Sequence, residues 1–309
     1  MRHITDAMVD AVLTPQEVQR ALADAYRSLG EGKAALQPRI RTEVGGVKLS
    51  TLGAVLPQQG VAGAKVYTTS DGKFNFVILL FSAVDGRALA SFDAAAITRL
   101  RTAAGSVIAA RHLARAESRR LAVFGLGAQG RAHALQLAQA FPLTEIRVCS
   151  RSFNDEAARE LQDLCGVAVR RCEAAAALDG ADIVVTASRS RTPLFRGDQV
   201  SPGTFIAAVG SSLPDTRELD DATLARCSLM AVDWMPQTTV EAGDIVLADP
   251  AALPKSKLVE LADLVTGRAQ GRREAAEVTI YKTVGVGLQD VAVAGLAWQL
   301  LNPSDSAGV

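Results

Sequence analysis

The chain has 309 residues, of which 49% are hydrophobic, so it can bury a substantial core. Lys plus Arg and Asp plus Glu both number 33, and this balance gives no electrostatic reason for a nucleic-acid or membrane partner. The opening MRHITDAMVD lacks the apolar segment of a signal peptide, and the longest apolar run, FVILLF at 76–81, is too short to span a membrane. We therefore expect a cytoplasmic protein that acts on a small molecule.

Residues 1–112 are predicted to form an α+β unit. Its expected elements are an amphipathic helix at 14–32, β-type segments at 47–52, 63–69, 74–84 and 87–93, and a long helix at 95–115. The end of the chain, 278–301, predicts a strand, a glycine-containing loop and a helix so apolar that it must be buried. We expect this helix to complete the first domain, giving one domain of 1–112 plus 284–309 and a second of 113–283.

From about residue 119 to residue 206, short apolar strands alternate with helices. The strands are expected at 120–125, 145–150, 167–170, 181–188 and 204–210, with helices at 128–141, 155–165 and 172–180. Strands separated by helices of this length form βαβ units in a parallel sheet. The expected fold class is α/β: a Rossmann-type doubly wound parallel sheet plus a smaller α+β domain for substrate binding and dimerisation.

A G-x-G-x-x-G sequence directly follows the first of these strands and opens the next helix. There, Gly125 permits a tight turn, Gly127 lets the backbone approach a pyrophosphate, and Gly130 lets helix and strand pack closely. The pyrophosphate would lie on N–H groups at the helix start, at Ala128 and Gln129. The sequence thus predicts a dinucleotide site; a glycine turn without a ligand is the alternative.

The next strand ends in Ser150, Arg151 and Ser152, where an NAD site would carry Asp or Glu. A guanidinium and two hydroxyls suit a 2′-phosphate, which a carboxylate would repel. We therefore expect NADP(H) to be preferred over NAD(H). A solvated loop arginine is the alternative for Arg151.

Two later strand ends are expected to face the nicotinamide, because ligands bind beyond the carboxyl ends of parallel strands. A nucleophilic serine there is disfavoured, because GSSLP at 210–214 lacks the second glycine of a nucleophile elbow. The residues concerned are Ala187, Ser188, Val209, Gly210, Ser211 and Ser212.

The cysteines, histidines and buried cations are the remaining candidates for metal, disulfide or ligand-binding sites. Four cysteines without C-x-x-C spacing and three scattered histidines predict neither a metal site nor disulfides. Arg41, Lys65 and Arg101 lie among apolar residues, and a buried cation costs free energy unless it is paired. A substrate carboxylate would be a suitable partner; an internal salt bridge or a snorkelling side chain is the alternative.

Seven segments, in order along the chain, match one known family. They are GVAGAKV at 60–66, ITRLRTAAGSVIAARHLAR at 97–115, GLGAQGRAH at 125–133, GADIVVTAS at 180–188, AAVG…REL at 207–219, TVEAGDI at 239–245 and TIYKTVG at 279–285. Together they resemble the ornithine cyclodeaminase/mu-crystallin family. The resemblance implies a homodimer that transfers a hydride between a nicotinamide and a carbon bearing nitrogen.

The resemblance also implies roles for single residues. By position in the motifs, Arg41 and Arg101 would bind a substrate carboxylate, Lys65 would be the active-site lysine, and Thr102 and Gly285 would contact the cofactor.

Two departures from the family pattern affect these roles. In cyclodeaminases a catalytic aspartate follows the AVG strand, and this chain has Ser212 there. Leu52-Gly53 replaces the usual Met-Pro pair. A serine alone cannot take a proton from a substrate ammonium, and Ser212 together with Arg151 resembles the ketimine-reductase side of the family.

We therefore predict an NADP-dependent oxidoreductase acting on C–N bonds. It would reduce a small ketimine or cyclic imino acid of the pyrroline- or piperideine-2-carboxylate type, or reversibly dehydrogenate an amino acid. Lys65, through water or Ser212, would keep the imine nitrogen protonated. The alternatives are an ornithine cyclodeaminase, an ammonia-lyase with catalytic NAD, and a non-catalytic protein that binds NADPH or another small ligand.

Overall fold

A computed structural model describes residues 1–151 and 153–303. The chain forms two compact units: unit 1 comprises residues 1–105 and the segment from 285 onward, and unit 2 comprises residues 106–284. The boundary at 105 lies inside helix α3 (Ala95–Leu113), and the boundary expected after residue 112 falls in the same helix.

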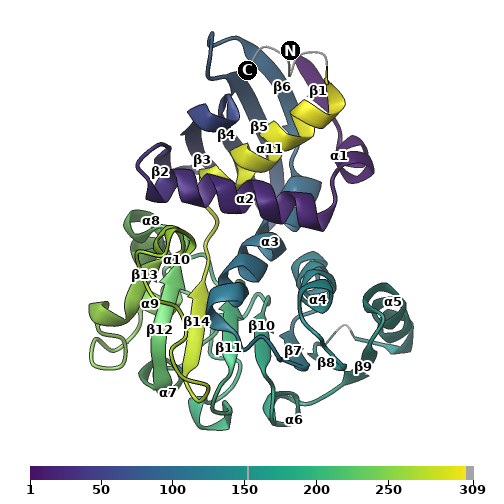
Figure 1. Ribbon diagram of the computed structural model, residues 1–309, viewed down its shortest axis with the longest axis vertical. Helices are drawn as coiled ribbons and strands as arrows, with labels where there is room; N and C mark the ends of the chain where they lie inside the picture. Colours follow the sequence, from purple (N-terminus) through teal and green to yellow (C-terminus); the bar gives the residue numbers. More distant parts are fainter. Residues whose placement is uncertain (152, 304–309) are drawn as a thin grey trace. The chain divides into compact units, whose positions relative to one another are not determined.

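Unit 1 is built on a six-stranded sheet in the order β1-β6-β5-β4-β3-β2 (Figure 1). Strands β2 to β6 pair antiparallel, whereas β1 pairs parallel with β6. The strands are β1 (Arg2–Ile4), β2 (Ala35–Val44), β3 (Val47–Leu56), β4 (Val61–Ser70), β5 (Lys73–Ser82) and β6 (Ala88–Asp93). Two helices, α1 (Asp6–Val12) and α2 (Pro15–Gly30), precede most of the sheet in sequence.

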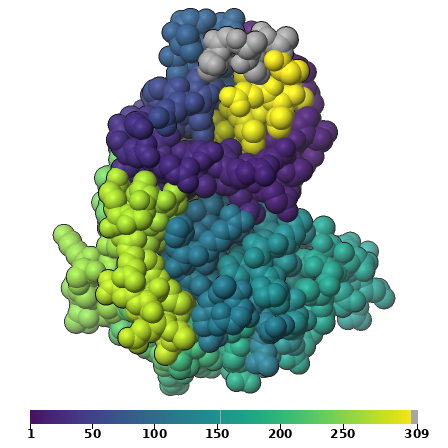
Figure 2. All heavy atoms as spheres, viewed as in Figure 1, coloured from purple at the N-terminus to yellow at the C-terminus, as the bar shows by residue number. Residues whose placement is uncertain are grey.

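The apolar C-terminal helix α11 (Gly287–Leu301) belongs to unit 1 and is buried along most of its length. It packs on α2 and on β3 and β4, so the two ends of the sequence lie side by side, yellow against purple in Figure 2. A Cβ on Gly287 would lie closer than 3.0 Å to the backbone of Gly53. Helix and strand therefore touch backbone to backbone where the family pattern has its Met-Pro pair.

Unit 2 contains an eight-stranded sheet in which every pairing is parallel, in the order β13-β12-β14-β11-β10-β7-β8-β9. From β7 the chain proceeds outward through β8 and β9, then returns to the other side of β7 with β10 and β11. Ligands bind at such a switch of direction, beyond the carboxyl ends of the strands. The expected doubly wound parallel sheet is confirmed.

The elements of unit 2 match the predicted alternation closely. Its strands are β7 (Arg120–Phe124), β8 (Glu145–Cys149), β9 (Ala168–Arg171), β10 (Ile183–Thr186), β11 (Phe205–Ala208), β12 (Cys227–Val232), β13 (Leu258–Glu260) and β14 (Val278–Lys282). Its helices after α3 are α4 (Ala128–Ala140), α5 (Asp155–Cys165), α6 (Ala174–Leu178), α7 (Asp221–Arg226), α8 (Met235–Glu241), α9 (Gly243–Val246) and α10 (Leu261–Thr266).

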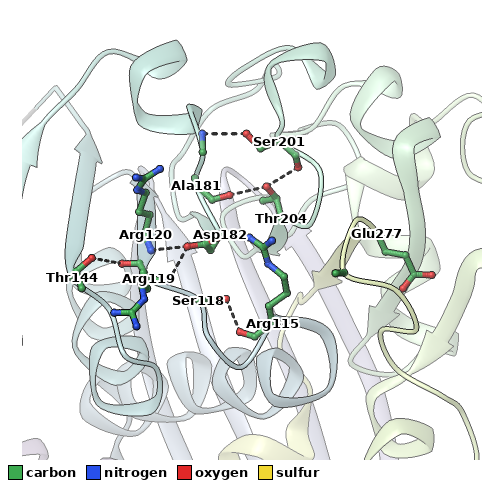
Figure 3. A network of polar contacts seen from close by, with 12 residues as sticks. Arg115, Ser118, Arg119, Arg120, Thr144, Ala181, Asp182, Ser201, Thr204 and Glu277 are labelled. Atoms are coloured by element: carbon green, nitrogen blue, oxygen red, sulfur yellow. Dashed lines mark hydrogen bonds and ion pairs between the residues drawn. The ribbon is translucent and has the colours of Figure 1, made fainter.

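Asp182 fixes the amino ends of β7 and β10 to each other (Figure 3). Its carboxylate accepts hydrogen bonds from the backbone N–H groups of Arg119 at 2.8 Å and Arg120 at 2.9 Å, and it forms an ion pair with Arg115. Nearby, Thr204 Oγ1 donates to the Ala181 carbonyl at 2.8 Å. This edge of the sheet is opposite the glycine loop.

Membrane spans, metal-ligand clusters and disulfides can each be checked against the structure. Among residues 1–151 and 153–303, no helix is both long and apolar enough to cross a membrane. Within the same residues, no three His, Cys, Asp or Glu side chains gather as metal ligands would. The four cysteines are free thiols.

Candidate functional site

Unit 2 contains a cavity of about 720 Å³ at the carboxyl ends of β7, β8 and β10. It opens beside the glycine loop. Six residues predicted to bind a cofactor line it: Gly125, Gly127, Ser150, Arg151, Ala187 and Ser188.

The glycine loop has the geometry that a pyrophosphate needs. Gly125 has φ +92°, and a Cβ there would lie 2.6 Å from the Ala187 carbonyl oxygen. At Gly127 a Cβ would meet nothing within 4 Å, so the backbone faces open space. Ala128 and Gln129 start α4, whose first N–H groups have no acceptor within the helix. These residues fit the pyrophosphate of a dinucleotide.

The end of β8 forms another part of the cavity wall. Ser150 Oγ accepts a hydrogen bond from the Leu126 N–H at 3.4 Å, and Arg151 is exposed to solvent. Arg171, at the end of the neighbouring strand β9, also lines the cavity. The third predicted residue, Ser152, lies outside the described residues.

The ends of β10 and β11 are held together by backbone and side-chain contacts. The N–H groups of Val209 and Gly210 both donate to the Thr186 carbonyl, at 2.8 and 3.0 Å. Ser211 is buried and its hydroxyl donates to the Thr216 carbonyl, so this serine stabilises the following turn. Ser212 is half-buried.

Unit 1 contains a cluster of buried charges around Lys65. Lys65 lies on β4 and is only 3% exposed. Its Nζ donates to Thr98 Oγ1 at 2.5 Å and to Asp290 Oδ1 at 3.3 Å, and it lies 4.3 Å from the centroid of the Phe76 ring. Asp290 comes from α11, which packs on β4.

Arg101, on α3, shares the same carboxylate. Its Nε donates to Asp290 Oδ1 at 3.2 Å and its Nη1 donates to Gln289 Oε1 at 2.6 Å. Gln289 in turn donates to the hydroxyl of Tyr26 at 2.8 Å. One buried carboxylate thus serves two buried cations, which leaves the cluster positive and suited to an anionic ligand.

Burial lowers the pKa of Lys65 from 10.5 to about 8. Asp290 acts in the opposite direction and raises it, whereas the positive charges of Arg101 and Arg39 lower it further. Burial dominates because an ammonium loses most of its hydration at this position. This pKa lies closer to neutrality than that of a solvated lysine, in the range that suits a general acid or base.

Arg39, rather than Arg41, is the β2 arginine whose charge acts on Lys65. It falls in a β-bulge, where strand pairing skips residues, and its Nη2 donates to the Gly285 carbonyl at 2.8 Å. A bulge redirects a side chain in this way. Arg41 lies two residues further along, paired with Ser50 and half-buried.

Two residues predicted to contact the cofactor also lie in this cluster. Gly285 has φ +75°, and a Cβ there would lie 2.8 Å from the guanidinium nitrogens of Arg101. Since Gly285 also accepts from Arg39, it lies between the two arginines. Thr102 Oγ1 donates to the Thr98 carbonyl at 2.6 Å.

Sequence reasoning missed three residues of these sites: Arg39, Thr98 and Asp290. Sequence reasoning chose Arg41 from its apolar setting and its position in the family motif, and it predicted neither strand β2 nor the bulge that carries Arg39. Asp290 is 225 residues from Lys65, and only the buried character of α11 pointed to its location. An acidic residue in an otherwise apolar terminal helix was the available signal.

The chain thus consists of a unit with a Rossmann-type parallel sheet and a glycine-loop cavity, and a unit that contains a buried lysine-arginine cluster. The chain belongs to the ornithine cyclodeaminase/mu-crystallin family, whose model matches residues 1–302.

Three related proteins are similar over almost the full chain. The structure of a probable ornithine cyclodeaminase from Bordetella pertussis Tohama I is 53% identical with a TM-score of 0.97, covering 99% of this chain and 98% of that one. The structure of Thermococcus litoralis Δ1-pyrroline-2-carboxylate reductase with NADH and L-proline is 25% identical with a TM-score of 0.92, covering 99% and 98%. Ketimine reductase mu-crystallin of Mus musculus is 30% identical, covering 96% of this chain and 94% of the relative.

Proposed function

We propose that the protein is a nicotinamide-dependent reductase of small cyclic imino acids, of the pyrroline- or piperideine-2-carboxylate type. The observation that carries this proposal is the buried cluster of Lys65, Arg101 and Asp290, with Arg39 beside it. The reverse reaction, dehydrogenation of the cyclic amino acid, uses the same groups. By name, the mouse relative is a ketimine reductase and the Thermococcus relative is a Δ1-pyrroline-2-carboxylate reductase.

The substrate's carboxylate would bind to Arg101 and Arg39. Their guanidinium groups flank Gly285, which has no side chain to fill the space. We assign this role to Arg39 in preference to Arg41 because Arg39 carries the charge that acts on Lys65. Planar guanidinium groups bind carboxylates through paired hydrogen bonds.

Lys65 would keep the imine nitrogen protonated. Protonation of the nitrogen makes the imine carbon more electrophilic. A bound nicotinamide cofactor supplies the hydride that this carbon accepts. With a pKa of about 8, Lys65 is mostly charged at neutral pH and can still give up its proton. Ser212 would assist through its hydroxyl, where a cyclodeaminase has its aspartate.

We further propose NADP(H) as the preferred cofactor, bound at the glycine loop and at the ends of β10, β11 and β8. Arg151 and Arg171 end adjacent strands and line the same cavity, so both are available to a 2′-phosphate. Ser150 would contribute its hydroxyl, as would Ser152. The Thermococcus structure contains NADH, which makes NAD(H) the competing cofactor.

Ornithine cyclodeamination is the second candidate function. It is favoured by the name of the Bordetella structure, a probable ornithine cyclodeaminase that is 53% identical to this chain. Against it, Ser212 stands where cyclodeaminases carry the aspartate that takes a proton from the substrate.

Product analysis separates the two functions. The purified protein is incubated with pyrroline-2-carboxylate and NADPH or NADH, and separately with ornithine and a catalytic amount of NAD⁺. The reductase proposal predicts proline and stoichiometric cofactor oxidation in the first reaction, and little ammonia in the second. Proline and ammonia from ornithine, without imine reduction, would establish cyclodeamination instead.

A further inference from the structure

Glu218 places a fully buried carboxylate at the carboxyl edge of the unit 2 sheet. It follows β11 in sequence and accepts four hydrogen bonds. Its Oε2 accepts from Thr186 Oγ1 at 2.8 Å and from the Gly210 N–H at 2.8 Å. Its Oε1 accepts from the N–H of Ser188 at 2.9 Å and from the Ser188 hydroxyl at 2.6 Å.

These donors come from the ends of two adjacent strands. Thr186 is the last residue of β10, Ser188 lies two residues beyond it, and Gly210 follows β11. A Cβ on Gly210 would collide with the Ser188 carbonyl and with the Glu218 carboxylate. The glycine is therefore required for this close arrangement, and the carboxylate ties the two strand ends to each other.

A second buried carboxylate holds the backbone of Glu218 itself. Asp244 Oδ1 accepts from the N–H groups of Glu218 at 2.7 Å and Leu219 at 2.9 Å. Asp244 is paired with Lys282, with 2.8 Å between Nζ and Oδ2, and Lys282 also donates to the Ser211 carbonyl at 2.6 Å. The loop from 210 to 219 is thus fixed at both of its ends.

We propose that Glu218 is a positioning residue that sets the nicotinamide end of the cofactor site. This inference rests on the proposed function, because it takes the ends of β10 and β11 as the segments that face the nicotinamide. Burying an ionised carboxylate costs free energy unless several donors satisfy it. Here all four donors belong to Thr186, Ser188 and Gly210, at the ends of β10 and β11. Glu218 acts through their backbone.

Asp182 supplies a matched control. It is also a carboxylate that ties two strand ends through backbone N–H groups, and it acts on the other end of β10 (Figure 3). The variants Glu218→Gln and Asp182→Asn therefore both remove a charge that joins strands. Only the first acts at the cofactor edge.

The test compares the affinity for intact cofactor with the affinity for its adenosine end. Dissociation constants are measured for NADPH and NADH, and for adenosine 2′,5′-bisphosphate and AMP, in the wild type and both variants. Thr186→Val, which removes one of the four hydrogen bonds, is the milder second variant, and melting temperatures show that each protein is folded.

We expect Glu218→Gln to raise the dissociation constant of the intact cofactor by about tenfold, the effect of losing one hydrogen bond to a charged group. Thr186→Val should raise it less. The adenosine fragments should change by less than about twofold. Asp182→Asn should lower the melting temperature and leave every dissociation constant unchanged.

Unchanged cofactor affinity in Glu218→Gln and Thr186→Val would overturn the inference. So would parallel weakening of cofactor and fragment, or the same weakening in Asp182→Asn, because each would indicate a general structural role. A wild-type protein that binds neither NADPH nor NADH would instead refute the proposed function, and with it this inference.

Discussion

Lys65 is subject to two opposing effects, burial and the charge of Asp290, and burial is the stronger. The folded-state pKa of about 8 lies below the ordinary value of 10.5, so the unfolded chain binds more protons at Lys65 between these two pH values. Lys65 therefore increases the free energy of unfolding as pH rises through that window. Its charged form, the form that would protonate an imine, is lost over the same interval.

Imine reduction should consequently lose rate above about pH 8. Asp290→Asn removes the charge that raises the pKa of Lys65, so the alkaline limb of kcat/KM should move to lower pH by on the order of one unit. Asp85→Asn, at an exposed turn, is the control and should leave the limb in place. A limb that does not move in Asp290→Asn would show that Lys65 is not the titrating group.

The two β2 arginines offer a direct comparison. Arg39→Gln should raise KM for the imino acid by about tenfold to a hundredfold, since a hydrogen-bonded charge pair with the carboxylate is lost. Arg41→Gln, two residues away, should change KM far less. Saturation kinetics of both variants measure the difference, and a larger effect in Arg41→Gln would return the assignment to the residue favoured by the sequence pattern.

At the residue level, the sequence predicted those site residues whose roles depend on neighbours only a few positions away in the chain. The glycine loop is an example, because its three glycines act through local turns and helix packing. Arg39, Asp290 and Glu218 were not predicted, since a bulge or a long-range contact gives each its surroundings. Ser211 appeared chemically interesting in the sequence, and its hydrogen bond to Thr216 makes it a turn residue.

Among the elements, β14 and α9 are joined by the buried pair Lys282 and Asp244, neither of which is exposed. Lys282→Met would leave the Asp244 carboxylate buried without its counter-ion. We expect a loss of about 3–5 kcal/mol in the free energy of unfolding, measured with urea. The double variant Lys282→Met/Asp244→Asn should recover part of that loss, and equal losses in both proteins would contradict the charge-pair explanation.

Element prediction succeeded where apolar runs were long or regularly spaced. The strands from β7 to β11, helices α2, α4 and α5 and the buried α11 follow from such patterns. The region 213–277 gave no clear prediction because its helices α7 to α10 have only four to seven residues. Helices this short show no periodicity, and their stability depends on tertiary packing.

At the scale of the whole molecule, a large apolar surface lies on the face of the unit 1 sheet opposite Lys65. The pairing register puts six residues on it, each 43–81% exposed: Ile40, Val44, Val47, Leu49, Val55 and Val77. Apolar patches of this kind mark association surfaces. We propose that a second copy of the chain covers this face in a homodimer.

Val77→Glu should therefore convert a dimer into a monomer, because it would bury an unpaired charge in the interface. Val240→Glu, at a 63% exposed valine of α8, is the matched control and should remain dimeric. Sedimentation at micromolar concentration measures both masses. A monomeric wild type, or a dimer that persists in Val77→Glu, would exclude this face as the interface.

Lys65, as the proton donor of an imine reductase, is the residue on which the proposed function depends most. The most direct measurement is the steady rate of NADPH and NADH oxidation with pyrroline-2-carboxylate and piperideine-2-carboxylate, in the wild type and in Lys65→Ala. We predict turnover of at least one of these imines by the wild type and a loss of about a hundredfold or more in Lys65→Ala, the typical contribution of a general acid. Absence of turnover with both imines and both cofactors, or an undiminished rate in Lys65→Ala, would contradict the account.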